Sequence, residues 1–329
     1  MTREQVDALV AKLGDVRASI ARVVVGQEDV VEQLLIVLLA GGHGLVEGVP
    51  GLAKTLLVRS LAAALDLDFR RIQFTPDLMP GDVLGSEVLE NTSDGHRALT
   101  FRPGPVFTNL LLADEINRTP ARTQAALLEC MAERSVTYAG KTYALDAPFV
   151  VLATQNPVEQ SGTYALPEAQ LDRFLLHIEI GYPSEDDERA VLARTTGAES
   201  AAISPVMHGR DVTMLQALTR EVVISDALLD SVTTLIRATR PGGRGTSDTI
   251  NASVEWGAGP RAGQALILCA KARALVHGRF AVTRDDLAAL ALPALRHRML
   301  LNFDADARGL TVADLVQPLV RTCLHNDTP

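Results

Sequence analysis

The sequence predicts an α/β domain with a mainly parallel sheet, followed by a smaller all-α domain. Short apolar segments alternate with helical periodicity in the first half of the chain, as in a parallel sheet covered by helices. Strand patterns stop after residues 183–188, and helical patterns follow. The length of 329 residues also fits two domains of roughly 100 to 200 residues each. We therefore expect domains at residues 1–182 and 183–329.

The first elements lead into a glycine-containing loop. Residues 4–20 place apolar side chains at three- and four-residue spacing, which predicts an amphipathic N-terminal helix within residues 1–22. A second helix is expected over 29–39, a strand over 43–47, a loop over 48–55 and a helix over 55–65. This part therefore has the order strand, loop, helix.

Further strands are expected over 69–74, 110–113, 149–153 and 175–180, with a helix over 122–133. Two segments interrupt this alternation and predict β-hairpin insertions. The first spans 84–106 and turns near 91–96, and the second spans 135–148 and turns at 139–141. Each hairpin should decorate a connection rather than extend the sheet.

Helical periodicity dominates the second domain. Helices are expected over 187–194, 212–223, 226–239, 261–277 and 284–295. Residues 240–253 concentrate Pro, Gly, Ser and Thr, which predicts a mobile loop between two of these helices.

The composition narrows the class of protein. A net charge of −9 and a pI near 5.3 disfavour a broad nucleic-acid surface and favour a protein partner. The longest apolar run, residues 34–40, is far shorter than a membrane span, and no signal-peptide pattern begins the chain, so we expect a cytoplasmic protein without membrane insertion. Three widely separated cysteines, Cys130, Cys269 and Cys323, predict buried thiols rather than disulfides or a metal site.

The loop after the first strand has the pattern of a phosphate-binding loop. It follows an apolar strand and opens an apolar helix, where backbone amides and the helix N-terminus attract phosphate. We expect Lys54 to reach the β- and γ-phosphates of ATP, and the Thr55 hydroxyl to bind Mg²⁺. Ala53 stands where the general pattern has glycine, and its methyl group is tolerable if the residue has helical dihedral angles. The expected nucleotide-binding residues here are Gly48, Val49, Pro50, Gly51, Leu52, Ala53, Lys54, Thr55 and Leu56.

Two later strands end in polar side chains at the same edge of the predicted sheet. Asp114 and Glu115 follow the apolar run Leu110 to Ala113. We expect Asp114 to position Mg²⁺ through its water shell, and Glu115 to orient and deprotonate the attacking water. Asn156 follows another buried strand, and its amide is suited to bridge this water and the γ-phosphate.

Four motifs together resemble the MoxR family of AAA+ ATPases. They are Gly48-Val-Pro-Gly-Leu-Ala-Lys-Thr55, Asp114-Glu-Ile-Asn-Arg118, Ala153-Thr-Gln-Asn-Pro157 and Leu166-Pro-Glu-Ala-Gln-Leu-Asp-Arg-Phe174. The resemblance covers residues 24–295, and the alanine at position 53 matches that family's usual variant. It implies an AAA+ P-loop domain with a helical lid, and a ring, usually a hexamer, with ATP at subunit boundaries.

The resemblance also implies roles for residues that the general motifs leave open. Val25, Gly26 and Gln27 resemble the segment beside the adenine, and Asn156 resembles the sensor-1 residue. Arg173 resembles the arginine finger that reaches the neighbour's γ-phosphate, although an ion pair with Asp172 or Glu168 is the alternative. Arg261 resembles the sensor-2 arginine, with a plain surface arginine as the alternative. Arg118 is left open between a contact to the adjoining subunit and solvation of its turn.

Several functions remain open at this level. The leading hypothesis is a chaperone-like ATPase that remodels or matures a partner protein. The resemblance implies a partner with a von Willebrand factor A domain and help with cofactor or metal insertion. Alternatives are a metal-chelatase-like motor subunit, a nucleic-acid-dependent motor, which the acidic balance disfavours, and a nucleotide-gated scaffold without hydrolysis.

Overall fold

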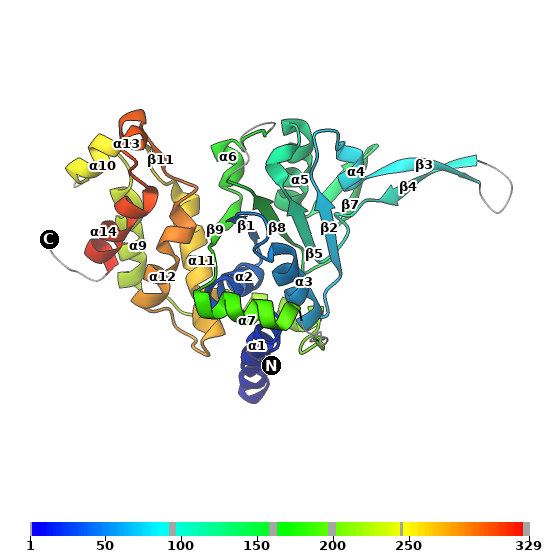
Figure 1. Ribbon diagram of the computed structural model, residues 1–329, viewed down its shortest axis with the longest axis horizontal. Coiled ribbons are helices and arrows are strands. Elements are labelled where there is room, and N and C mark those ends of the chain that lie inside the picture. The colour runs from blue at the N-terminus through cyan, green and yellow to red at the C-terminus, as the bar shows by residue number, and fades with distance from the viewer. Residues whose placement is uncertain (1, 92–96, 158–162, 197–201, 244–245, 325–329) are drawn as a thin grey trace.

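The computed structural model describes residues 2–91, 97–157, 163–196, 202–243 and 246–324 (Figure 1). Its centre is a five-stranded sheet in the order β2-β5-β8-β1-β9. Every neighbouring pair is parallel, which confirms the predicted fold class. The strands are β1 (His43–Gly48), β2 (Phe69–Gln73), β5 (Leu110–Asp114), β8 (Val150–Gln155) and β9 (Phe174–Ile180).

Helices cover both faces of the sheet because its central strands are apolar on both sides. Leu110 and Leu112 of β5 belong to the core formed with α1 (Arg3–Ala21), α2 (Glu28–Ala40) and α3 (Lys54–Ala64). Leu111 and Ala113 face the opposite core, which α4 (Pro80–Leu84) and α5 (Ala121–Glu133) complete. Alternation along one buried strand therefore builds two separate cores.

The two predicted hairpins are present. The first consists of β3 (Gly85–Asn91) and β4 (Arg97–Pro103) and projects from the body (Figure 1). Its turn was predicted near 91–96, of which 92–96 lie outside the described residues. The second consists of β6 (Ser135–Tyr138) and β7 (Lys141–Ala144). Phe101 of the first stacks on Tyr143 of the second with ring centroids 4.3 Å apart. The hairpins are therefore in direct contact.

The C-terminal region is helical, as predicted, and contains one short antiparallel strand pair, β10 (Val254–Trp256) with β11 (Leu300–Leu301). The expected helices are α7 (Glu185–Thr195), α8 (Gly209–Glu221), α9 (Asp226–Ala238), α11 (Pro260–Val276) and α12 (Arg284–Leu295). Three helices that the sequence did not predict are α10 (Asp248–Ser253), α13 (Phe303–Ala307) and α14 (Val312–Leu324). A four-residue helix, α6 (Glu168–Leu171), precedes β9. The division at residue 182 stays a prediction.

The predicted mobile loop over 240–253 is wrong in its second half, where α10 forms. The Ser247 side chain caps this helix by accepting a hydrogen bond from the Ile250 amide, and Ile250 is buried. The Asn251 side chain accepts a hydrogen bond of 2.7 Å from the Gly242 amide. Here the serine therefore caps a helix and the asparagine hydrogen-bonds to the preceding loop, so neither indicates an irregular segment.

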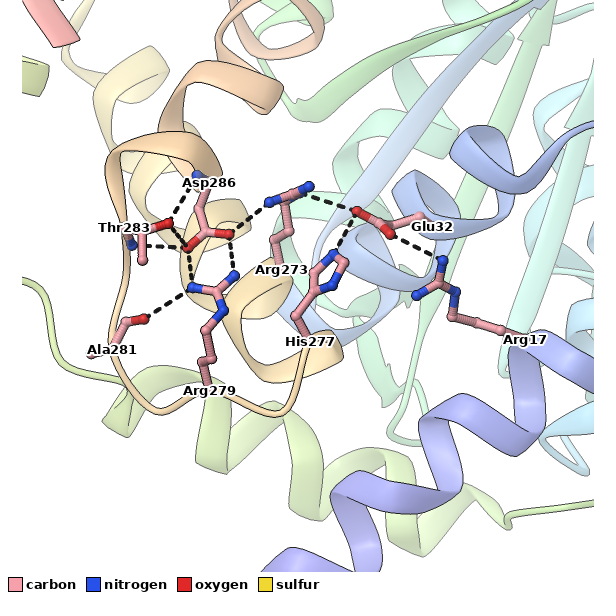
Figure 2. A network of polar contacts seen from close by, with 8 residues as sticks. All are labelled: Arg17, Glu32, Arg273, His277, Arg279, Ala281, Thr283 and Asp286. Atoms are coloured by element: carbon pink, nitrogen blue, oxygen red, sulfur yellow. Dashed lines mark hydrogen bonds and ion pairs between the residues drawn. The ribbon is translucent and has the colours of Figure 1, made fainter. Parts of the chain in front are cut away.

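An ion-pair network joins the C-terminal helices to α1 and α2 (Figure 2). Glu32 of α2 pairs with Arg17 of α1 at 3.3 Å and with Arg273 of α11 at 3.1 Å. Arg273 also pairs with the buried Asp286 of α12 at 2.8 Å, and Arg279 adds a second cation at 2.6 Å. Burial would raise the pKa of Asp286, but hydrogen bonds, chiefly from Arg279, outweigh it and lower that pKa to about 2. Asp286 therefore stays charged at neutral pH.

We expect the free energy of unfolding to fall by about 2 kcal/mol between pH 7 and pH 5 because of His43. His43 is buried, its Nε2 donates to the Met131 carbonyl, and its Nδ1 accepts from the Val151 amide. This geometry leaves no place for a second proton, and burial lowers the pKa of His43 from 6.5 to about 4. In that window the unfolded chain binds the proton and the folded chain does not, so stability falls as the pH falls. Urea unfolding at both pH values measures the effect.

The matching control is His43→Gln, which is less stable but has no proton to gain at this position. Its loss between pH 7 and pH 5 should be about 2 kcal/mol smaller than that of the wild type. Equal losses in the two proteins would contradict the assignment to His43.

The predictions of buried thiols and of no membrane span concern the three cysteines and the longest apolar helices. The three cysteines are free thiols; Cys130 and Cys269 are buried, and burial raises the pKa of each to about 12. Cys323 is only half-buried. Among the described residues, no helix combines the length and apolarity that crossing a bilayer requires.

Candidate functional site

The loop between β1 and α3 is shaped for an anionic ligand. Gly51 has φ +89°, a conformation that favours glycine, and a Cβ on Gly48 would lie 2.9 Å from the Ile180 carbonyl oxygen. The helix begins at Lys54, whose Nζ donates to the Gly48 carbonyl at 2.5 Å. Burial lowers the pKa of Lys54, while Asp114 and Glu115 oppose this shift. The loop therefore presents a cation and a helix N-terminus beside the acidic pair.

Ala53 does not have the helical dihedral angles that were the condition for tolerating its methyl group. This residue lies in the left-handed region, with φ 56° and ψ 22°, immediately before α3. A left-handed alanine costs roughly 1–2 kcal/mol because its Cβ crowds the backbone. The chain tolerates this strain where the more general motif has glycine.

The segment Val25 to Gln27 lies against the loop, next to α2. Gln27 Nε2 is 3.5 Å from the Leu52 carbonyl oxygen, and Gly26 has φ +70°. A Cβ on Gly26 would come within 2.4 Å of the Asp187 carboxyl carbon at the start of α7. Glycine is therefore required both by the backbone conformation and by the approach of α7.

Asp114 is almost fully buried at the end of β5, with 7% of its surface exposed. Its Oδ1 accepts a hydrogen bond of 2.5 Å from Thr154 Oγ1. Its Oδ2 accepts hydrogen bonds from Arg71 Nε at 3.0 Å and Arg71 Nη2 at 2.6 Å. The carboxylate is thus held in one orientation by two neighbouring strands.

Glu115 lies just beyond the strand in the left-handed region, with φ 58° and ψ 49°. Its amide donates to Thr154 Oγ1 at 2.8 Å, and its Oε2 accepts from Gln73 Nε2 at 2.5 Å. Arg118 Nε lies 3.3 Å from the same oxygen, so Arg118 pairs within its own chain. Asn156, 4% exposed, follows the end of β8 at the same edge.

Three residues that hold the acidic pair were missed in the sequence: Arg71, Gln73 and Thr154. Two of them alternate on β2, in the short run Phe-Arg-Arg-Ile-Gln, so the strand period places Arg71 and Gln73 on one face. The register pairs Gln73 with Asp114. The available signal was the pair of polar side chains two residues apart on an edge strand. Using it requires the strand order, which the sequence does not show.

Arg173 and Arg261 lie at the opposite edge of the sheet from the phosphate-binding loop. Arg173 immediately precedes β9, whose first residue Phe174 pairs with His43 at the start of β1, while Gly48 pairs with the far end of β9. At about 3.3 Å per residue, the two edges are about 17 Å apart. Arg261 opens α11 and reaches this same edge, 3.6 Å from Asp172.

The ion pair that was the alternative for Arg173 is not formed among the described residues. Arg173 is exposed and donates from Nη1 to the Leu128 carbonyl. Asp172 pairs instead with the buried Arg298, at 2.7 Å, and with Arg261, whose side chain is 65% exposed. Both Arg173 and Arg261 are therefore exposed and lie at the edge of the sheet away from the phosphate-binding loop of their own chain.

The residues at the carboxyl edge suit ATP with Mg²⁺. Open space around Gly51 and the amides at the start of α3 fit a polyphosphate, and Lys54 supplies a partly buried positive charge. Oxygen ligands of Thr55 and Asp114 match the preference of Mg²⁺. A phosphate-binding loop joined to an acidic strand end on a parallel sheet defines a P-loop nucleotide-binding protein.

Comparison with known proteins places the chain in a class and then in a family. Residues 43–176 match the model of the ATPase family associated with various cellular activities (AAA), and residues 247–319 match the AAA lid domain. The chain is 42% identical over 304 residues to Chaperone MoxR1 of Mycobacterium tuberculosis, covering 92% of this chain and 79% of the relative. It is 32% identical to Protein MoxR of Paracoccus denitrificans, covering 89% of each. The chain belongs to the MoxR family of AAA ATPases.

Two further relatives match almost end to end. The YeaC protein of Bacillus subtilis is 42% identical, covering 94% of this chain and 93% of its own. A crystal structure of a Cytophaga hutchinsonii protein superimposes with a TM-score of 0.90 at 42% identity, covering 97% of this chain and 96% of the other. The fold described above is therefore shared by a solved relative.

Proposed function

We propose that this protein hydrolyses ATP with Mg²⁺ at the boundaries between copies in a ring, most simply a hexamer. The observation that carries the proposal is the separation of Arg173 and Arg261 from the phosphate-binding loop of the same chain. In this proposal both arginines serve the ATP of a neighbouring copy. An interface that repeats head to tail in this way gives a ring when the rotation between copies closes.

Each site residue has a distinct task in this proposal. The loop and Val25 to Gln27 bind the nucleotide, Thr55 and Asp114 hold Mg²⁺, and Glu115 activates water that Asn156 helps to orient. The neighbour's Arg173 stabilises charge on the γ-phosphate in the transition state, and its Arg261 contacts the same phosphates. Hydrolysis would then depend on assembly.

We further propose that hydrolysis remodels or matures a partner protein in the cytoplasm, including insertion of a cofactor or metal, together with a von Willebrand factor A domain protein. One relative carries the name chaperone, and the net charge of −9 disfavours nucleic acid as the client. The projecting first hairpin offers exposed Leu89 and Leu99, paired across its strands, as a surface for such a client (Figure 1).

Assembly and hydrolysis measured on the same samples test the proposal. Wild-type protein should form a ring in Mg²⁺ and a non-hydrolysable ATP analogue, detected by mass photometry, and release phosphate from ATP. The rate per chain should rise with protein concentration as rings form. A monomer with an undiminished rate per chain at all concentrations would refute a site shared between copies.

A further inference from the structure

Arg71 holds the carboxylate that the proposed function assigns to Mg²⁺. Its Nε and Nη2 both donate to Asp114 Oδ2, at 3.0 and 2.6 Å. Thr154 Oγ1 donates to Asp114 Oδ1 at 2.5 Å. The Asp114 side chain is 10% exposed, so it needs a counter-charge. The Arg71 side chain is 47% exposed and has room to turn toward solvent.

Arg71 and Mg²⁺ compete for the same oxygen. Two hydrogens of one guanidinium occupy both lone-pair positions of Oδ2. A hydrated Mg²⁺ held through Oδ2 of Asp114 would need one of those positions, and two cations at one carboxylate repel each other. Lys54 is bonded to the Gly48 carbonyl instead, and Arg118 pairs with Glu115.

We propose that Arg71 is a positioning residue that neutralises Asp114 until Mg²⁺ arrives, and that binding of Mg²⁺ with ATP displaces its guanidinium. This inference rests on the proposed function, because that function assigns the metal to Asp114. Arg71 thereby sets the Mg²⁺ concentration that the site requires. It also prevents Asp114 from repelling the phosphates of metal-free ATP.

Binding of a fluorescent, non-hydrolysable ATP analogue to Arg71→Ala separates these two effects. In EDTA the variant should bind the analogue about tenfold more weakly than wild type, because Asp114 then faces the phosphates without a counter-charge. In a titration with Mg²⁺, the Mg²⁺ concentration at half-saturation should be about tenfold lower for the variant, because Arg71 no longer competes with the metal. At saturating Mg²⁺ the two proteins should bind the analogue equally.

Matched variants give the comparison its controls. Arg70→Ala removes the adjacent, exposed arginine of β2 and should behave as wild type. In an Asp114→Asn background, adding Arg71→Ala should leave the ratio of EDTA to Mg²⁺ affinities unchanged. If Arg71→Ala does not fold, Arg71→Gln gives the same comparison, since it removes the charge and the paired donors and keeps a polar side chain.

Two results would overturn the inference. Equal weakening in EDTA and at saturating Mg²⁺ would show that Arg71 binds phosphate directly. A Mg²⁺ midpoint equal to that of Arg70→Ala would show that Arg71 does not compete with the metal.

A metal-only measurement distinguishes failure of this inference from failure of the ATP site. Mn²⁺ binding to the nucleotide-free chain, followed by water proton relaxation, should be about tenfold tighter in Arg71→Ala than in Arg70→Ala. That difference in a protein that binds no nucleotide would refute the proposed function and uphold the role of Arg71. Equal Mn²⁺ binding would refute the role of Arg71 whatever the nucleotide result.

Discussion

A Glu115→Gln variant is expected to bind ATP as tightly as the wild type and to hydrolyse it at least about 100-fold more slowly. General-base catalysis contributes roughly 10² to 10⁴ in rate, and an amide cannot accept the proton of the attacking water. The substitution preserves shape and leaves one oxygen to accept from Gln73 and Arg118, which now contact Glu115 Oε2. Single-turnover phosphate release and binding of an ATP analogue measure the two quantities separately.

The control for this variant is Glu129→Gln, an exposed glutamate on α5 that should hydrolyse ATP normally. Near-normal hydrolysis by Glu115→Gln would remove Glu115 from its assigned role. The variant also has a preparative use, because a ring arrested with ATP bound should retain its client protein in a pull-down.

An Arg173→Ala variant is expected to lose about 10³-fold or more in hydrolysis while retaining ATP binding. Arginine fingers are worth roughly 10³ to 10⁵ in turnover because they neutralise charge that develops in the transition state. Arg173 is exposed at the amino edge of β9, and under the proposed function it serves the ATP of a neighbouring copy. Steady-state hydrolysis at protein concentrations that support assembly gives the measurement.

Mixing two inactive variants tests whether Arg173 acts between copies. In rings of Arg173→Ala and Glu115→Gln mixed one to one, an active site needs Glu115 from one copy and Arg173 from the next. Random assembly gives that combination at about one quarter of the boundaries, so about one quarter of wild-type activity should return. No recovery would place Arg173 in its own chain's site. The control is Arg122→Ala, which replaces an exposed arginine on α5 and should hydrolyse ATP without a complementing variant.

The sequence was sufficient to predict those parts of the structure that a local pattern determines. The strands, the parallel sheet and both hairpins follow from apolar periodicity and turn residues, and β1 and α3 flank the phosphate-binding loop as expected. The acidic pair lies at the end of β5 as predicted. These features depend on residues that are close in the chain.

Features that depend on strand order or on tertiary support could not be predicted. Arg71 reaches Asp114 only because β2 is the neighbour of β5 in the sheet. Ala53 adopts a left-handed conformation because the surrounding loop enforces it, against its own preference. The short helix α10 was hidden by a composition typical of loops, and its buried Ile250 becomes informative only once the core is known.

The helix α11 has a consequence that reaches beyond one active site. Its 17 residues form a rod about 25 Å long. Arg261 at its first turn lies at the edge that we assign to the neighbour's ATP, while Arg273 near its other end grips Glu32 of α2 (Figure 2), the helix that begins beside Gln27. Helix α11 therefore connects that edge to the start of α2, so under the proposed function the nucleotide state of one copy would be passed to Val25 to Gln27 of the next.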